Sequence, residues 1–450
     1  MIHKFIVNSK INKAFLLKAQ FKEDKQVFLK KENYILDNPE KEISTIYLGS
    51  KANFDLNKLI SILRLIVNNN ERIYQIDAST FKNKKITIDD VTKNFIYIWY
   101  EVYGKQFNLK TKKIKDNLPT YLLINKFDAK FNEDILIASQ MCEIKTLQDS
   151  APNILTVNKF IKYIQNLCKK NNFLKLTILD KKELQKLNMN LIIGVNQGSE
   201  EDVKVAIIEY KGSISKEKTT FVGKGIMFDS GGYNLKTPGK YMLDMKYDMS
   251  GAAISILLVD TIAKLKIKKN VSCIVPLTDN MIDSLAQLPE SILTSMSGKS
   301  VEVANTDAEG RLILADAITY AAKKLDSSLI IDLSTLTGTI IYALGKYTGA
   351  WTTKDNHWNL LEKAAKKENE LIWRMPINDI YLETLNKNTF ADTLSCSNID
   401  KPDSNIAATW LKQFAINRDY IHLDIAGSAD INSKGQAPMF RTLIEFIKNL

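Results

Sequence analysis

The chain has 450 residues, of which 45% are hydrophobic and 25% are charged. This is ordinary globular composition over a length that suits two or three domains, so a largely disordered protein is excluded. The net charge of +11 comes almost entirely from lysine, because only six of the 62 basic residues are arginine. Recognition of phosphate and guanine favours arginine, so the charge is weak support for nucleic-acid binding.

The first part of the chain, residues 1–130, predicts a small α/β domain of unknown role. Residues 41–50 (KEISTIYLGS) are typical of a strand, and the apolar residues within 54–69 have helical spacing. The periodicity of the next segment predicts a linking helix over residues 131–150. Residues 151–450 would then form a second and larger domain.

In this larger part, apolar runs alternate with helical patterns. Strands are predicted at residues 190–194, 204–210, 219–228, 271–277, 328–333 and 420–426. Helices are predicted at residues 246–265, 310–325, 339–345, 355–369, 406–415 and 440–450. The alternation indicates an α/β fold, with a mixed, mainly parallel sheet covered by helices on both faces. Functional groups in such folds gather where strands end and helices begin.

One acidic motif falls at such a place. The stretch VANTDAEGRLILAD, residues 303–316, carries Asp307, Glu309, Arg311 and Asp316 around the start of a predicted helix. Alone it is weak, because acidic residues before a helix commonly stabilise the positive end of its dipole. If the loop is extended, Asp307, Glu309 and Arg311 point the same way.

A second polar cluster, residues 221–253, precedes the first. A predicted strand leads into Lys224 and Asp229, a glycine pair and Lys236 follow, and Asp248 opens a helix. Glycines beside charged residues let the backbone approach a ligand closely. The cluster is not a nucleotide-phosphate loop, because the pattern GxxxxGK[ST] is absent.

The two clusters together offer four carboxylates: Asp229, Asp248, Asp307 and Glu309. Carboxylates that converge without cations repel one another, and some stay protonated. Paired divalent metals about 3.5–4 Å apart, bridged by shared carboxylates, are the usual solution in hydrolytic sites. The chain has three histidines, and His422 is interpreted as a buried core residue, so carboxylates would have to supply most ligands.

The motifs VGKGIMFDSGG, NLK, DMKYDMSGAA and NTDAEGRLILADA, in this order, resemble the leucine (cytosol) aminopeptidase family of dinuclear metallopeptidases. The stretches SMSGKSVEV, STLTG, HLDIAG and RTLIEF match as well. The resemblance covers residues 147–450 and is loose over the first 130 residues. It implies that residues 151–450 form a metallopeptidase catalytic domain. Its activity would be removal of Leu, Met and similar apolar residues from peptide N-termini.

The resemblance also implies two divalent metal ions, Zn or Mn, per subunit. By motif position, one ion would be surrounded by Lys224, Asp229, Asp248 and Glu309. The other would be surrounded by Asp229, Asp307 and Glu309, so that Asp229 and Glu309 bridge. A lysine ligand must be neutral, and two nearby cations would depress its pKa.

Two basic residues would be catalytic by the same resemblance. Lys236 would donate to the oxyanion that develops on the scissile carbonyl, and Arg311 would hold a bicarbonate that acts as general base. Leu336 would offer its carbonyl to the substrate amine. The pocket for the first side chain would be formed by Met245, Thr335, Gly338, Ala426 and Ala429.

Two stretches depart from the family pattern, and the first, residues 194–212, lacks the prolines that usually follow QGS. Residues 391–410, ADTLSCSNIDKPDSNIAATW, have no glycine pair where the family commonly has one before a helix. This predicts an altered loop near the pocket.

Two other functions stay open at this stage. A carboxylate-rich two-metal phosphoesterase is expected to have histidine ligands or a loop that binds phosphate, and the sequence shows a motif for neither. A nucleic-acid-binding protein that keeps the peptidase fold is permitted by the +11 charge but has no motif.

The four cysteines lack CxxC spacing, which favours free thiols in a reducing compartment. No stretch reaches about 18 uninterrupted apolar residues, and the N-terminus lacks the apolar core of a signal peptide. We therefore expect a cytoplasmic protein without a membrane span, assembled by family resemblance as a homohexamer.

Overall fold

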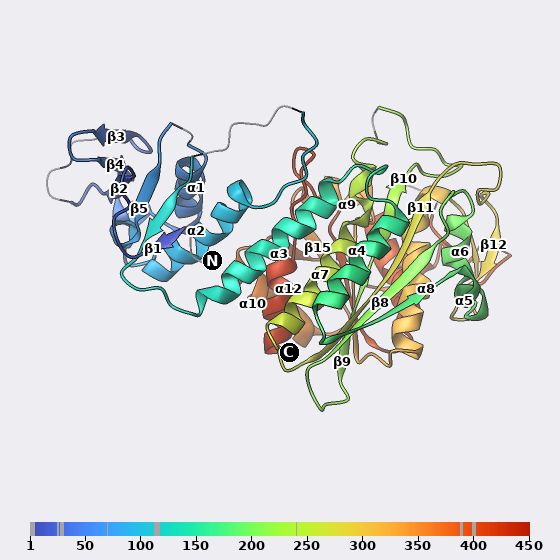
Figure 1. The fold of residues 1–450 in the computed structure, drawn as a ribbon. Coiled ribbons are helices and arrows are strands. Elements are labelled where there is room, and N and C mark those ends of the chain that lie inside the picture. Colours follow the sequence, from blue (N-terminus) through green and yellow to red (C-terminus); the bar gives the residue numbers. More distant parts are fainter. Residues whose placement is uncertain are drawn as a thin grey trace. The chain divides into compact units, whose positions relative to one another are not determined.

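The computed structural model describes residues 5–24, 27, 31–69, 71–111, 118–239, 241–387, 390–397 and 402–450. The chain forms two compact units, Met1–Glu143 and Ile144–Leu450, and the division falls within helix α3 (Phe131–Asp149) (Figure 1). Among the described residues, no helix is long and apolar enough to cross a membrane.

The N-terminal unit is built on a six-stranded sheet with the order β1-β6-β5-β2-β4-β3. Its strands are β1 (Ile6–Val7), β2 (Phe15–Gln20), β3 (Ile35–Asn38), β4 (Ile43–Tyr47), β5 (Tyr74–Asp77) and β6 (Tyr121–Leu123). The pairs are parallel except β3 with β4. Helices α1 (Leu56–Val67) and α2 (Ile88–Tyr103) each bury one apolar face in the core of this unit.

The C-terminal unit contains a nine-stranded mixed sheet with the order β16-β15-β18-β14-β9-β11-β8-β7, in which β10 also pairs with β11. The central strands β18, β14, β9 and β11 run parallel to one another. The antiparallel pairs are β15 with β18, β8 with β11 and β7 with β8. The bounds are β7 (Leu174–Leu179), β8 (Lys204–Lys211), β9 (Lys218–Gly223), β10 (Gly225–Asp229), β11 (Asn270–Asn280), β14 (Leu329–Ser334), β15 (Thr348–Thr352), β16 (Ile372–Arg374) and β18 (Asp419–Asp424). A separate three-stranded sheet joins β12 (Ile292–Thr294), β13 (Ser300–Glu302) and β17 (Thr393–Leu394).

Helices cover both faces of the nine-stranded sheet, as predicted. They are α4 (Val157–Lys170), α5 (Lys181–Lys186), α6 (Asn190–Asn196), α7 (Ser250–Lys264), α8 (Glu309–Lys323), α9 (Gly338–Leu344), α10 (Asp355–Glu368), α11 (Asp403–Lys412) and α12 (Phe440–Asn449). Helices α6, α8 and α11 share one apolar core with alternate strand residues such as Val222, Ile274 and Ile330. Because successive strand residues face opposite sides, the intervening residues pack under α7, which contacts α4 and α12.

Residues 190–194, predicted as a strand, form helix α6 instead. A short apolar run does not distinguish a buried strand from a buried helix by periodicity. The amides of Leu191 and Ile192 donate to the Asp316 carboxylate at 3.0 and 3.3 Å. A side chain from α8 therefore satisfies the first turn of this helix, which the local sequence does not reveal.

The strand predicted over residues 219–228 is broken at Lys224 into β9 and β10. The Lys224 amide donates to the Leu333 carbonyl at 3.0 Å, and its carbonyl accepts from the Ala252 amide at 2.9 Å. The break therefore fixes the Lys224 backbone between β14 and the start of α7. The sequence does not predict three further strands of this sheet, β7, β15 and β16.

Candidate metal centre

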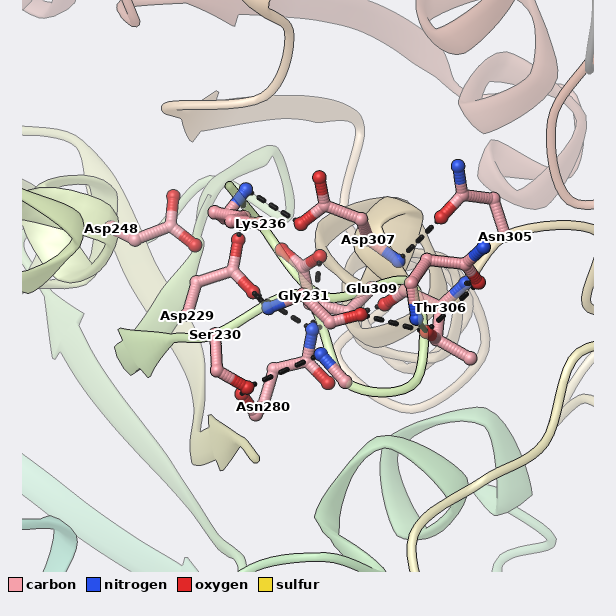
Figure 2. A network of polar contacts seen from close by, with 12 residues as sticks. Asp229, Ser230, Gly231, Lys236, Asp248, Asn280, Asn305, Thr306, Asp307 and Glu309 are labelled. Carbon is pink, nitrogen blue, oxygen red and sulfur yellow. Dashed lines mark hydrogen bonds and ion pairs between the residues drawn. The ribbon is translucent and has the colours of Figure 1, made fainter. Parts of the chain in front are cut away.

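The four predicted acidic ligands meet at the carboxyl ends of the central strands. Asp229 ends β10, Asp248 lies in the short turn before α7, and Glu309 begins α8. Oxygens of these three side chains all lie within 4.8 Å of one another, and all three residues are buried. Figure 2 shows Asp307 beside this group, facing Lys236.

Lys224 lies inside the cluster and is only 3% exposed. Its Nζ is 2.8 Å from Asp248 Oδ1 and 2.9 Å from Glu309 Oε1, and it donates to the Thr335 carbonyl at 2.9 Å. A Cβ at Gly310 would lie 2.6 Å from Lys224 Cε and 2.7 Å from its Nζ. The absence of a side chain at Gly310 therefore leaves the space that the lysine occupies.

Lys236 bridges the other two carboxylates. Its Nζ lies 2.8 Å from Asp229 Oδ2 and 2.6 Å from Asp307 Oδ1, with the side chain 13% exposed (Figure 2). The chain reaches this position through a tight turn at Gly231, where φ is +89° and a Cβ would lie 2.5 Å from the Asn234 carbonyl oxygen. Only glycine adopts such a conformation without strain.

Asn280, the last residue of β11, is a site residue that the sequence interpretation missed. Its Nδ2 donates to Asp229 Oδ1 at 2.8 Å and to the Thr306 carbonyl at 3.0 Å, and lies 3.4 Å from Glu309 Oε2. It therefore ties together carboxylates from two segments (Figure 2). The signal that would have found it is its place just after the predicted strand at 271–277.

Burial and mutual repulsion raise the pKa of three of the four carboxylates. Burial, with the charges of Asp229 and Glu309, raises the pKa of Asp307 to about 7 despite Lys236. Burial likewise raises the pKa of Asp229 and of Asp248. For Glu309, burial is outweighed by the positive charges of the two lysines, so its pKa is lowered.

The donor set fits divalent cations. Asp248 Oδ2 is buried and has no hydrogen-bond partner among the described residues, so its lone pairs are available to coordinate a cation. Burial lowers the pKa of Lys224, but the charges of Asp248, Glu309 and Asp229 raise it by a larger amount, so the net shift of the pKa is upward. Two divalent ions in the cluster would reverse that balance, as a neutral lysine ligand requires.

Contrary to the assumption of the sequence interpretation, the segment that carries Arg311 is not extended, and the described hydrogen bonds of Arg311 go to groups other than the four proposed acidic ligands. A 3₁₀ turn (Thr306–Ala308) leads directly into α8, so residues two apart point in different directions. Arg311 is 3% exposed. Its Nη1 donates to the Ser395 carbonyl at 3.2 Å and its Nη2 to Asp403 Oδ1 at 2.9 Å.

Comparison with known proteins gives the family. Residues 143–444 match the catalytic domain of the cytosol aminopeptidase family. A protein of Metamycoplasma salivarium named "Probable cytosol aminopeptidase" is 41% identical over 451 residues, covering 97% of this chain and 86% of that protein. The chain belongs to the cytosol aminopeptidase family. The predicted family and fold class are thereby confirmed, and membership supports a peptidase activity.

A further relative agrees with this membership of the cytosol aminopeptidase family, and a solved structure agrees with the fold. The "Probable cytosol aminopeptidase" of Mycoplasma genitalium is 41% identical over 341 residues, covering 75% of this chain and 76% of that protein. The structure of "Bottromycin maturation enzyme BotP" has a TM-score of 0.84 and 22% identity, covering 97% of this chain and 99% of its own. At that identity it supports the fold alone.

The pocket residues inferred from the cytosol aminopeptidase family lie partly on one loop, between β14 and α9. Thr335 Oγ1 donates to Asp248 Oδ1 at 2.7 Å, so this side chain also holds a proposed ligand. The amides of Leu336 and Ala426 both donate to Asp424 Oδ1, at 3.2 and 3.1 Å, which brings the loops after β14 and β18 together. A Cβ at Gly338 would meet open space.

The remaining two pocket residues lie on other segments. Met245 is half-buried and lies three residues before Asp248. Ala429 is buried, and its carbonyl accepts from Gln148 Nε2 at 3.1 Å.

Proposed function

We propose that this protein is an aminopeptidase that removes N-terminal Leu, Met and similar apolar residues from peptides with the help of two divalent metal ions. Membership of the cytosol aminopeptidase family supports peptidase activity. The observation that carries the finer proposal is the buried convergence of Asp229, Asp248 and Glu309 within 4.8 Å. Asp307 and two lysines lie around them.

Lys224, Asp229, Asp248 and Glu309 would hold one ion, and Asp229, Asp307 and Glu309 the other. When bound, such ions polarise a carbonyl and lower the pKa of a bound water. The carboxylate-rich donor set suits Mn or Zn, and a BotP structure is described as a complex with Mn.

Lys236 would stabilise the oxyanion. An ammonium group has three hydrogens, and the Lys236 contacts with Asp229 and Asp307 use two of them. The third is left to donate to the scissile carbonyl oxygen as negative charge develops there.

The free Oδ2 of Asp248 would accept a hydrogen bond from the α-amine of the peptide. A site that binds this amine restricts cleavage to the first residue. The side chain of this first residue would enter the pocket formed by Met245, Thr335, Gly338, Ala426 and Ala429. The Leu336 carbonyl would accept a hydrogen bond from the α-amine of the substrate.

The decisive test compares hydrolysis of Leu-p-nitroanilide and of p-nitrophenyl phosphate with added Mn²⁺ or Zn²⁺. We expect cleavage of the anilide alone, and cleavage of the phosphate alone would instead indicate a phosphoesterase. Asp307→Ala is expected to abolish peptidase activity while the protein stays folded by circular dichroism. Activity retained by this variant in metal-supplemented buffer would contradict the proposed centre.

A further inference from the structure

The side chain of Asn280 joins the two segments that supply the acidic ligands (Figure 2). Its Nδ2 donates to Asp229 Oδ1, at the end of β10, at 2.8 Å and to the Thr306 carbonyl, in the turn before α8, at 3.0 Å. The same nitrogen lies 3.4 Å from Glu309 Oε2. An asparagine amide has two hydrogens, so the bonds to Asp229 and Thr306 use both of them.

The backbone holds Asn280 opposite Asp229. Strands β10 and β11 pair in parallel, and these two residues are partners in the register. The Asn280 carbonyl accepts from the Ser230 amide at 2.9 Å and from Ser230 Oγ at 2.8 Å. All the groups around Nδ2 are acceptors, so the flipped amide would place oxygen against oxygen. The donor therefore faces the carboxylates before any ligand binds.

This contact decides how the Asp229 carboxylate is turned. Oδ1 accepts from the Gly231 amide at 2.9 Å as well as from Asn280, and these two bonds use its two lone pairs. Oδ2 lies 2.8 Å from Lys236 Nζ. Asp229 therefore presents Oδ2 to the rest of the cluster.

Loss of the Asn280 amide would act on the two ligands that both proposed ions share. Under the proposed function, Asp229 and Glu309 would each contact both ions, whereas Asp248 would contact one. Thr306 lies three residues before Glu309, so the bond to its carbonyl also fixes the start of α8. Hydrogen bonds to the ligands of a metal ion orient those ligands, and their removal usually weakens metal binding by roughly 10- to 100-fold.

We propose that Asn280 is the positioning residue that sets the affinity of the candidate centre for both ions, by fixing Asp229 relative to the turn before Glu309. Asn280 acts through these ligands and does not touch the substrate. The inference rests on the proposed aminopeptidase function, because that function requires the two ions. It concerns the binding of metal, so its test does not depend on catalysis.

The test measures binding of Mn²⁺ to the metal-free protein by isothermal titration calorimetry. The unmodified protein should bind two ions. Asn280→Ala should raise the Kd of both by roughly 10- to 100-fold, and Asn280→Leu, which fills the space without a donor, should do the same. An unchanged Kd for either ion in both variants would overturn the inference. If the unmodified protein bound no Mn²⁺, the proposed function itself would fail, and the inference with it.

Asn270→Ala is the matched control. Asn270 is the first residue of β11, whereas Asn280 is the last, and both are buried. Asn270 Nδ2 donates to the Ser215 and Glu217 carbonyls at 2.6 and 3.2 Å, so it also ties a neighbouring segment to the strand. We expect Asn270→Ala to lower the urea midpoint of the metal-free protein and to leave both Kd values unchanged. Equal weakening of Mn²⁺ binding by Asn270→Ala would show a general effect of destabilisation and would overturn the inference.

Thr335→Val distinguishes a shared ligand from an unshared one. Thr335 Oγ1 donates to Asp248 Oδ1 at 2.7 Å, and valine keeps the shape of the side chain without the hydroxyl. We expect this variant to weaken the binding of one ion much more than that of the other. Equal weakening of both ions by Thr335→Val would overturn the assignment of the shared effect to Asn280.

A crystal structure of the unmodified protein with Mn²⁺ covers the case in which both Asn280 variants fail to fold. The Asn280 Nδ2 should remain within hydrogen-bond distance of Asp229 Oδ1 and of the Thr306 carbonyl. An amide turned away from Asp229 in that structure would overturn the inference.

Discussion

At the residue scale, the candidate centre depends on a residue without a side chain. Gly310 lies in the first turn of α8, between Glu309 and Arg311, and the ammonium group of Lys224 occupies the space where its Cβ would be. The Lys224 side chain has little freedom to move aside, because its Nζ contacts Asp248, Glu309 and the Thr335 carbonyl.

Gly310→Ala is therefore expected to lower kcat/KM by roughly 10²-fold, since small displacements of catalytic groups have effects of that size. Stability should change little, because alanine favours a helix over glycine by about 1 kcal/mol and this offsets part of the clash. Steady-state kinetics and a urea unfolding curve on the same sample check both parts. A variant with normal kinetics would show that the Lys224 position is unimportant.

His422 makes a buried contact whose contribution to stability depends on pH. Its Nδ1 lies 2.7 Å from Asp332 Oδ1, and both side chains are fully buried. Burial lowers the pKa of His422, but the charge of Asp332 raises it more, so the net shift is upward. A folded-state pKa above the unfolded value means that the stabilisation is fully present below the unfolded pKa and is lost as pH rises through the folded one.

The difference in unfolding free energy between the unmodified protein and His422→Gln should therefore shrink as the pH is raised from about 6.5, the ordinary pKa of histidine, into the alkaline range. Denaturant unfolding of the metal-free protein across this range measures it. With three histidines in the chain, NMR titration identifies the shifted one directly. A difference that grows with pH would mean that burial, and not Asp332, dominates.

At the scale of elements, the start of α7 approaches the central strands closely. A Cβ at Gly251 would lie 2.0 Å from the Leu333 carbonyl oxygen of β14, and one at Gly223 would lie 2.5 Å from the Gly251 carbonyl oxygen. These glycines let the helix that follows Asp248 pack against β9 and β14. The placement of Asp248 beside Glu309 thus depends on close packing of helix and sheet.

Gly251→Ala should destabilise the protein by about 1–3 kcal/mol, the usual cost of overpacking a core. It should also weaken metal binding, because α7 would have to move. Gly338→Ala is the control for stability, since a Cβ there meets open space. Equal unfolding midpoints for the two variants would contradict the close approach.

At the scale of the whole molecule, bound metal should stabilise the folded state. Ions that bind only the folded chain stabilise it by about 2.7 kcal/mol at a concentration 100 times Kd. We expect Mn²⁺ or Zn²⁺ to raise the melting midpoint of the unmodified protein and to have much less effect on Asp229→Ala, which lacks a proposed bridging ligand. Identical shifts for both would place the metal elsewhere.

A homohexamer in the cytoplasm is the assembly that we propose from the family. Light scattering of the purified protein should give about six times the mass of one chain, 51.1 kDa. A monomer that is fully active on Leu-p-nitroanilide would refute the assembly without affecting the metal centre.

Much of the site could be predicted from the sequence because its residues follow a local rule. Asp229, Asp248, Asp307 and Glu309 lie where strands end and helices begin, and the fold brings these ends together. The same rule points to Asn280, which follows a predicted strand. Sequence patterns were therefore enough to predict the fold class and the family and to propose the acidic metal ligands.

Which groups a side chain meets depends on the three-dimensional packing of distant segments and could not be predicted from local patterns. Residues 190–194 are helical because Asp316, more than 100 residues away, accepts from their amides. Arg311 meets Asp403, 92 residues along the chain. The local pattern of apolar and polar residues indicates which positions are buried and which secondary structure they form. The partner of a buried charged residue depends instead on how distant segments pack together.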